Sequence, residues 1–389
     1  MRIGIDARWL SKPNPSGIGV YLTEVLTRLN RRDDGHEYYL FSNKPFVDTI
    51  GTGLHFHRVL IPAKIGSLWM LRELAARLPD YHLDVFWGPE HVLPGGLKGV
   101  RKVLTIHDIA LMIHPSWGKW SNALIQNTLA RVSVRRADVI VADSKSTKKD
   151  LVTRLRVRPE RIHGVYPGRN EPAPFTEEEA REVLCRILHG TDPGHTTGNG
   201  SKPYLLYVGT LEPRKNVVSI IRAYERIRQE AEYSNLSLVL AGGLGWKYEG
   251  ILDAIARSPY REDILRPGYI SDMEKSVLLH HTEAFLFPSF YEGFGIPVVE
   301  AICAGAPVVT AGNSSLPEAA GPSEFYVDRA DDVNAICGEI RKILSMTEEE
   351  KKRRNESSRA YVKRFSWDRC ADRIGKILTE GNGARSSLL

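Results

Sequence analysis

Short apolar runs alternate with helix-like stretches along this chain, and the alternation occurs in two separate series. The first series has apolar runs at residues 2–7, 38–42, 85–87, 102–106 and 137–142, and the second has them at 204–208, 236–241, 284–287 and 307–310. Strands that alternate with helices form parallel sheets covered by helices. The sequence therefore predicts an α/β protein with two Rossmann-like domains that face each other across a cleft.

Length and local composition agree with two domains. A chain of 389 residues is long for a single hydrophobic core. The first series ends near Gly168, and residues 191–202, which are rich in Gly, Thr, Pro and Asn, predict a flexible loop. A last helix is predicted from Ser366, whose hydroxyl suits an N-cap and which is followed by apolar residues at helical spacing.

Two carboxylates, Glu292 and Glu300, lie eight positions apart with a glycine-rich turn between them. The run 284–287 predicts a buried strand before the turn, and Pro297 suits the first turn of a helix after it. Backbone N–H groups and the positive end of a helix in such a loop favour phosphate or sugar oxygens. Because carboxylates accept hydrogen bonds from hydroxyls, the stretch indicates a ligand with both phosphate and polyol groups.

Two adjacent cations, Arg214 and Lys215, follow the predicted strand 204–208 and precede a helix-like stretch. Cations in this position can neutralise a diphosphate and stabilise it as a leaving group. His107 follows another predicted strand, and open α/β sheets bind ligands at the carboxyl ends of their strands. His107 and Asp108 could instead form the acid–base pair of a hydrolase, but no G-x-S-x-G nucleophile motif accompanies them.

Composition argues against several other classes. No run approaches the roughly 18 apolar residues that a membrane-spanning helix needs. The N-terminal residues include an acid at position 6 and predict a first strand, not a signal peptide. The four cysteines have no C-x-x-C pair and no metal-ligand spacing, which predicts reduced thiols in a cytosolic protein. The sequence has no D-x-D motif, so we predict no metal at the site.

Two segments are candidates for contact with anionic partners. The net charge is +6, and residues 145–161 contain seven basic side chains against two acids. This run lacks the interleaved aromatic residues of a nucleic-acid site, so no nucleic-acid partner is predicted. A solvated helix face is the first interpretation and contact with anionic lipid the second. In the segment 64–78, Trp69, Met70 and Leu74 could enter a membrane interface, but core packing is favoured.

Residues 288–301 closely resemble the E-x7-E signature of retaining glycosyltransferases of family 4, which have the GT-B fold, and the resemblance extends over essentially the whole chain. In that family the first Glu contacts the donor sugar and the second binds the ribose hydroxyls of the nucleotide. The resemblance implies these roles for Glu292 and Glu300. It also implies donor contacts for the loop residues between them, Gly293, Phe294, Gly295 and Ile296.

The diphosphate-binding segment of the family matches the residues around Lys215. Family members usually carry an Arg directly after the glycine of this segment, but here Thr210 stands in that place and Arg214 lies beside Lys215. The string Leu-Glu-Pro-Arg-Lys-Asn resembles a subgroup rich in bacterial mannosyltransferases of surface polysaccharide assembly. The resemblance implies that Arg214 and Lys215 hold the diphosphate, and it leaves open whether Arg214 replaces the missing Arg.

Further contacts are implied for loops that follow other strands. By resemblance, His107 contacts the donor sugar, and the loop with Gly17 and Gly19 lies near the donor phosphates and the acceptor. Tyr269 and Ile270 are expected to contact the nucleotide base, largely through their backbone. The remaining candidates for the same cleft are Ser144, Lys145, Asp6, Arg8 and Glu318.

The resemblance also implies a domain plan and an activity. Residues 1–168 form an acceptor-side domain, residues 169–365 bind the nucleotide sugar, and the C-terminal helix 366–389 packs back onto the first domain. The implied enzyme is retaining, metal-independent and cytoplasmic, with peripheral contact to the inner face of the cell membrane as an option. It moves a sugar, best matched by mannose from GDP-mannose, to a glycan or polyprenyl-linked acceptor, and the nucleotide sugar is a co-substrate with no further cofactor.

Two alternatives stay open at this point. One is a non-catalytic nucleotide-sugar-binding or scaffold subunit of a polysaccharide assembly complex. The other is a different GT-B enzyme, such as a sugar-nucleotide epimerase or a phosphorylase.

Overall fold

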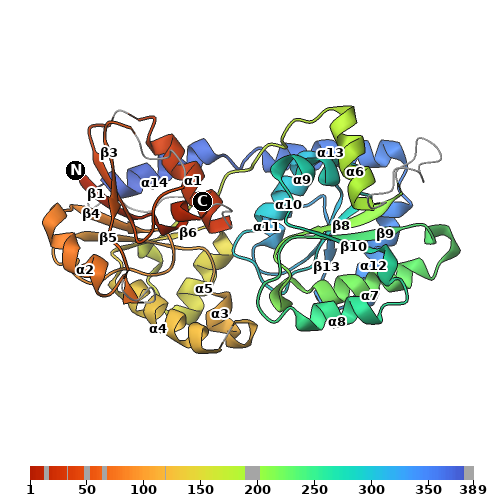
Figure 1. Cartoon of the computed structure of the whole chain (residues 1–389), viewed down its shortest axis with the longest axis horizontal. Helices are drawn as coiled ribbons and strands as arrows, with labels where there is room; N and C mark the ends of the chain where they lie inside the picture. The colour runs from red at the N-terminus through yellow and green to blue at the C-terminus, as the bar shows by residue number, and fades with distance from the viewer. Residues whose placement is uncertain are drawn as a thin grey trace. The chain divides into compact units, whose positions relative to one another are not determined.

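A computed structural model describes residues 1–12, 17–32, 34–47, 53–63, 68–118, 120–188 and 202–380, without the side chains of residues 120–126. The chain divides into two compact units (Figure 1). Unit 1 comprises Met1–Pro115, Trp120–Gly168 and Phe365–Leu389, and unit 2 comprises Ser116–Lys119 and Arg169–Arg364.

Unit 1 is built on a parallel sheet of seven strands in the order β3-β2-β1-β4-β5-β6-β7, with helices on both faces (Figure 1). Its strands are β1 (Arg2–Asp6), β2 (Glu37–Ser42), β3 (Phe56–Leu60), β4 (Val85–Gly88), β5 (Arg101–Ile106), β6 (Val139–Ala142) and β7 (Ile162–Gly164). Its helices are α1 (Gly17–Leu29), α2 (Glu73–Arg77), α3 (Ala110–Ile113), α4 (Trp120–Arg136), α5 (Lys145–Leu155) and α14 (Trp367–Thr379).

Alternating residues of the unit 1 strands enter two separate cores, because successive side chains of a strand point to opposite faces of the sheet. Ile3 and Ile5 of β1 belong to the core that includes residues of α1 and α14. The other core contains Trp69, Met70 and Leu74, which are at most 4% exposed. The alternative in which these three side chains enter a membrane interface is therefore wrong, and they pack as core residues.

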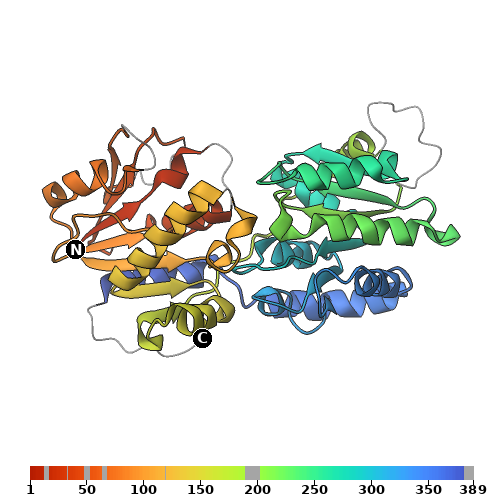
Figure 2. The ribbon, with the colours of Figure 1, turned by 90° about the horizontal axis from the view of Figure 1, so that it is seen from below.

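The C-terminal helix α14 lies against unit 1 (Figure 2). Ser366 caps it by accepting a hydrogen bond from the backbone N of Arg369, and α14 packs along α1. Arg28 of α1 donates to Asp368 Oδ1 at 2.7 Å. The far ends of the chain thus share one hydrophobic core.

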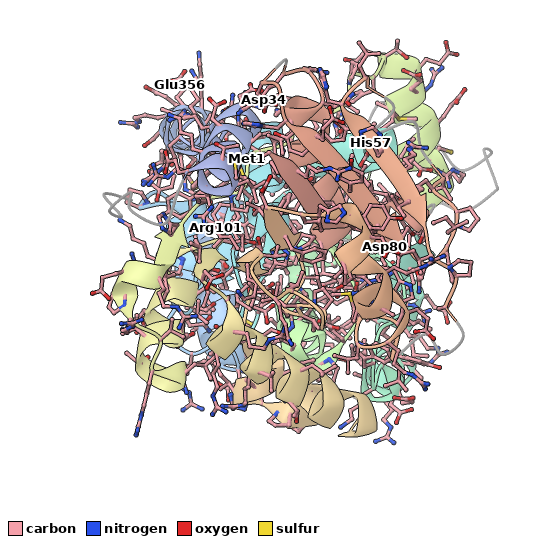
Figure 3. All side chains as sticks on the ribbon, turned by 90° about the vertical axis from the view of Figure 1, so that its left-hand side faces the viewer. Met1, Asp34, His57, Asp80, Arg101 and Glu356 are labelled. Carbon is pink, nitrogen blue, oxygen red and sulfur yellow. The ribbon has the colours of Figure 1, made fainter. Side chains whose placement is uncertain are left out.

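Figure 3 shows the amino edge of the unit 1 sheet, where Met1, Asp34 and Arg101 are labelled next to the starts of β1, β2 and β5. His57 of β3 is labelled on the same view. All the pairings are parallel, so the carboxyl ends of the strands gather at the opposite edge. The predicted ligand residues of this unit follow those carboxyl ends.

Unit 2 is built on a parallel sheet of six strands in the order β10-β9-β8-β11-β12-β13. The strands are β8 (Tyr204–Val208), β9 (Ser237–Ala241), β10 (Ile264–Gly268), β11 (Ala284–Phe287), β12 (Val308–Ala311) and β13 (Phe325–Val327). The helices are α6 (Glu177–Leu188), α7 (Val217–Arg228), α8 (Glu249–Arg257), α9 (Asp272–His281), α10 (Ile296–Ala304), α11 (Leu316–Ala320), α12 (Val333–Leu344) and α13 (Glu348–Val362).

The predicted fold class is confirmed, since each series of apolar runs forms one parallel sheet with flanking helices. The predicted loop at 191–202 lies, apart from Lys202, outside the described residues. Within the described part of the chain, no helix is long and apolar enough to cross a membrane. The four cysteines are free thiols, and Cys337 and Cys370 are buried.

Candidate functional site

In unit 2 the two predicted cations and the first predicted carboxylate meet at the carboxyl edge of the sheet. Arg214 and Lys215 lie in a short 3₁₀ turn, Pro213–Lys215, after β8, and Glu292 lies in the loop after β11. β8 and β11 are paired neighbours, so these loops leave the sheet side by side. A hydrogen bond from the backbone N of Phe290 to the carbonyl of Arg214, at 3.0 Å, joins the loops directly.

Glu292 accepts hydrogen bonds from both cations. Arg214 Nη1 lies 3.0 Å from Oε2, and Lys215 Nζ lies 2.7 Å from Oε1. Arg214 also donates from Nη2 to Glu212 Oε1 at 2.8 Å. We call Glu212, Arg214, Lys215 and Glu292 the unit 2 charge cluster; it balances two carboxylates with two cations, and each side chain is less than a fifth exposed.

The electrostatics of this cluster favour the ionised form of Glu292. Burial acts against the charge, but Arg214 and Lys215 outweigh it and lower the pKa of Glu292 to about 2. Burial and the adjacent Arg214 lower the pKa of Lys215, against the opposing effect of Glu292. Glu292 is therefore ionised around neutral pH, and the arginine and lysine beside it are side chains that an anionic ligand can bind.

The loop that carries Glu292 is held by its own neighbours. The backbone N of Glu292 donates to Ser314 Oγ at 3.0 Å, and Ser315 Oγ donates to the carbonyls of Glu292 and Phe294. Gly295 has φ = 106°, a conformation that L side chains rarely adopt, and it caps α10, whose first turn contains a proline as predicted. The residues 292–295 are buried, so the loop presents a fixed backbone at the start of α10.

Glu300 lies on α10 and has a different set of partners. Asn170 Nδ2 donates to Glu300 Oε1 at 2.8 Å, and Lys275 Nζ of α9 donates to the same oxygen at 3.0 Å. Burial would lower the pKa of Lys275, but Glu300 and Asp272 raise it overall. Asn170 and Lys275 were not among the predicted site residues, because both are far from Glu300 along the chain and no sequence signal links them to it.

The predicted base-binding residues follow β10. Tyr269 is 67% exposed, and Ile270 is partly buried. Directly after these two residues, Ser271 and Glu274 form a capping box that fixes the start of α9. β9 stands between β10 and β8, so the loop with Tyr269 is separated from the unit 2 charge cluster by one strand position.

In unit 1, His107 follows β5, and the structure surrounds it with polar groups at the carboxyl edge of the sheet. His107 Nδ1 lies 2.5 Å from Asp143 Oδ2, and Nε2 lies 2.8 Å from the carbonyl oxygen of Pro89. Burial would lower the pKa of His107, but Asp143 raises it overall. Asp143 directly follows β6, the neighbour of β5. Asp143 was not among the predicted site residues, although it directly precedes the predicted residue Ser144.

Ser144 is fully buried and caps α5 by accepting a hydrogen bond from the backbone N of Thr147 at 3.0 Å. Thr147 Oγ1 in turn donates to the carbonyl of His107 at 3.1 Å. The described contacts thus give Ser144 a structural place beside His107, and its predicted contact with a ligand stays a prediction.

The remaining candidates lie at several element ends. Gly17 and Gly19 belong to the first turn of α1, and the residues just before Gly17 are outside the described residues. Arg8 holds Asp6 with two hydrogen bonds of 2.8 and 2.9 Å. The backbone carbonyl of Glu318, in α11, accepts a hydrogen bond from Tyr361 at 3.0 Å.

Two family models match the chain: one described as Glycosyltransferase Family 4, over residues 15–171, and one described as Glycosyl transferases group 1, over residues 192–363. The O-antigen chain mannosyltransferase B of Escherichia coli is 29% identical over 374 residues, which cover 91% of this chain and 93% of the relative.

Solved structures resemble the whole chain. WaaG, a glycosyltransferase involved in lipopolysaccharide biosynthesis, matches with a TM-score of 0.72 at 17% identity, over 98% of this chain and 100% of that one. Anabaena HepE in complex with UDP-glucose matches with a TM-score of 0.71 at 16% identity, over 97% of this chain and 99% of that one.

Two parallel β-sheets with flanking helices in one chain, matched along their whole length by these structures, define the GT-B fold. The two family models together cover most of both units. The chain belongs to glycosyltransferase family 4, as the E-x7-E resemblance predicted.

Proposed function

We propose that this glycosyltransferase moves mannose from GDP-mannose, with retention of configuration and without a metal ion, to a glycan or polyprenyl-linked acceptor in cell-surface polysaccharide synthesis. The observation that carries the proposal is the unit 2 charge cluster, in which Arg214 and Lys215 converge on Glu292. The mannosyl part is supported by the relative from Escherichia coli, whose name is that of an O-antigen mannosyltransferase.

Arg214 and Lys215 bind the diphosphate of the donor in this proposal. Their charges neutralise the oxygen that departs when the bond between the anomeric carbon and the phosphate breaks, which is the task that a metal ion performs in other transferases. Lys215 is 11% exposed, so its charge acts in a poorly solvated environment, where electrostatic effects are stronger than in water. Arg214 takes over the role of the arginine that family members usually carry at the position of Thr210.

The two carboxylates of the E-x7-E stretch then divide the recognition of the donor. Glu292 orients the sugar while it holds the two cations in place. Glu300, which has Lys275 and Asn170 beside it, accepts hydrogen bonds from the ribose hydroxyls. Gly293, Phe294, Gly295 and Ile296 shape the pocket wall between them, and Tyr269 and Ile270 meet the base. Gly17, Gly19 and Ser144 of unit 1 complete the predicted donor contacts.

Transfer takes place on the face from which the diphosphate leaves. A bond forms between the acceptor oxygen and the anomeric carbon while the bond from that carbon to the phosphate oxygen breaks. The proton of the acceptor hydroxyl passes to the departing phosphate, so the protein need not supply a general base. His107 positions the sugar. Both domains take part, residues 1–168 with the helix 366–389 on the acceptor side and residues 169–365 on the donor side.

The place of action follows from the acceptor. A polyprenyl-linked acceptor lies in the membrane, so the proposed enzyme works in the cytoplasm with peripheral contact to the inner face of the cell membrane. The basic residues 145–161 are the candidate contact with anionic lipid headgroups.

The test is a thermal-shift panel with GDP, UDP, ADP and dTDP and their common sugars, followed by a turnover assay with each stabilising donor. We expect stabilisation by GDP and GDP-mannose, loss of that stabilisation in Lys215→Ala and Glu300→Ala, and turnover that survives EDTA. UDP-glucose, which the Anabaena protein binds, is the informative competitor. Stabilisation by UDP sugars in place of GDP sugars would refute the donor assignment, and binding without turnover would favour the non-catalytic alternative.

A further inference from the structure

Both ring nitrogens of His107 face acceptor atoms of the protein. The carbonyl oxygen of Pro89 has no proton to give, so Nε2 must carry one in order to make its 2.8 Å contact. An ionised Asp143 likewise accepts, so Nδ1 must carry a proton to make its 2.5 Å contact. An imidazole with a proton on both nitrogens is a cation.

The surroundings of Asp143 make its charge dependent on His107. Asp143 is 4% exposed, and within the described residues its Oδ1 atom has no hydrogen-bond partner. A buried carboxylate is stabilised by a paired, hydrogen-bonded cation, and His107 is in that position. The pKa of His107 is raised by this carboxylate despite burial, which agrees with the pairing.

The ring of His107 is also fixed in orientation. Its backbone N donates to His91 Nε2 at 3.1 Å, and its carbonyl accepts from Thr147 Oγ1 at 3.1 Å. The ring of Tyr21 meets it edge-on, with 5.0 Å between ring centroids. Because His91 Nε2 accepts this hydrogen bond it carries no proton, and burial lowers the pKa of His91 to about 4.

We propose that Asp143 is a positioning residue for sugar transfer: it holds His107 in one orientation as a doubly protonated imidazolium. This inference rests on the proposed role of His107 beside the donor sugar. In that role an imidazolium would add a positive charge beside the donor, where negative charge grows on the departing diphosphate, and a neutral ring would not. The ionisable groups that face His107 from the packed elements are Tyr21, Glu90, His91, Asp108 and Asp143. Asp143 also helps to raise the pKa of Cys370 on α14.

The test replaces the charge of Asp143 and keeps its shape. In Asp143→Asn the largest of the effects that raise the pKa of His107 is gone while burial remains, so we expect His107 to be neutral at pH 8. We expect kcat at pH 8 to fall by about tenfold or more and to recover as the pH is lowered toward 6. The KM for the donor should change little, because the nucleotide is bound by unit 2 in the proposed function.

Two variants separate this effect from a structural one. Asp138→Asn removes a carboxylate just before the same strand, where Asp138 pairs with Lys102 at 2.9 Å and is 40% exposed. It should leave the pH profile of kcat as in the wild type. Asp143→Glu keeps the charge and should restore activity at pH 8 in part.

A measurement on the unmodified protein reports the charge of His107 without any change at Asp143. Nitrogen-15 NMR of histidine-labelled enzyme, with His107→Gln to assign the signals, reports the protonation of both ring nitrogens. We expect both nitrogens of His107 to have imidazolium shifts at pH 7.5. A neutral ring, the state in which Asp143 would keep the proton, would overturn the inference, and so would an Asp143→Asn enzyme with a wild-type pH profile.

The NMR measurement tests the charge of His107 independently of the proposed donor, GDP-mannose. If GDP-mannose is not turned over, the donor assignment fails, whereas the NMR shifts still decide the charge of His107. Kinetic tests would then use whichever nucleotide sugar the enzyme accepts.

Discussion

Each unit of this enzyme has a buried carboxylate at the carboxyl edge of its sheet, but the two carboxylates have different kinds of partner. Glu292 in unit 2 is paired with an arginine and a lysine, whose ordinary pKa values lie well above neutral. Asp143 in unit 1 is paired with a histidine, which can release its proton. The same change, a carboxylate to an amide, should therefore have different consequences in the two units: uncompensated charge in unit 2, and a neutral ring in unit 1.

The largest effect is expected from Glu292→Gln. The amide leaves Arg214 and Lys215 next to each other without the carboxylate that they share. Removal of one member of a buried ion pair costs about 3 to 5 kcal/mol of unfolding free energy. Asp143→Asn should cost less, because His107 can become neutral. Urea unfolding followed by circular dichroism measures both. Glu212→Gln, which removes a partner of Arg214 alone, is the matched control. Equal losses of unfolding free energy in all three variants would contradict the expected difference between Glu292 and Asp143.

The acid stability of the enzyme provides the next test. The pKa of Glu292 is about 2 in the folded protein against an ordinary value of 4.5. A lowered pKa contributes stability above pH 4.5 that is lost as the pH falls toward 2, in total about 3 kcal/mol. The stability gap between wild type and Glu292→Gln should therefore narrow by about 1 kcal/mol between pH 4.5 and 3.5. A constant gap in urea unfolding over this range would show that the charge of Glu292 is not the cause.

Ligand affinity tests whether the cations of unit 2 bind phosphate. Charged hydrogen bonds contribute about 1.5 to 3 kcal/mol, so Lys215→Met should weaken GDP binding by roughly tenfold to a hundredfold. Guanosine, which has no phosphate, should bind both proteins equally in isothermal titration calorimetry. Lys342→Met, at an exposed lysine of α12, is the control and should bind GDP like the wild type. If Lys215→Met weakened guanosine binding as much as GDP binding, the variant would have damaged unit 2 in general.

The difference between interior and edge strands explains how much of the fold could be predicted. The nine predicted runs are the interior strands of both sheets, whose residues are nearly all buried, as in Phe285 and Leu286 of β11. The four strands that were missed, β3, β7, β10 and β13, are the outer strands of the two sheets. An outer strand has one neighbour and is partly exposed, so its sequence needs fewer apolar residues.

The candidate site was predictable to a different degree in each unit. In unit 2 the charges of Arg214, Lys215 and Glu292 lie in local motifs, and the adjacency of β8 and β11 brings them together. Asp143 was missed because the order of β5 and β6 in the sheet decides that it meets His107, and apolar runs do not reveal that order. Lys275 was missed because the packing of α9 against α10 brings it to Glu300, and the sequence does not reveal which helices are neighbours.

Glu300 is the carboxylate for which the smallest effect on stability is expected. Its cation, Lys275, also lies 3.2 Å from Asp272 and is 22% exposed, so Glu300→Gln leaves one partly solvated lysine that keeps a second partner. We expect a loss of about 1 kcal/mol or less in urea unfolding. The same variant should weaken GDP binding by about tenfold, because the ribose hydroxyls lose a charged acceptor. For 2′,3′-dideoxy-GDP, which lacks those hydroxyls, variant and wild type should bind alike. If Glu300→Gln weakened the binding of both nucleotides equally, Glu300 would support binding through Lys275 or the loop and not by contact with the ribose hydroxyls. The proposed roles, Glu292 for the sugar and Glu300 for the ribose, would then be wrong.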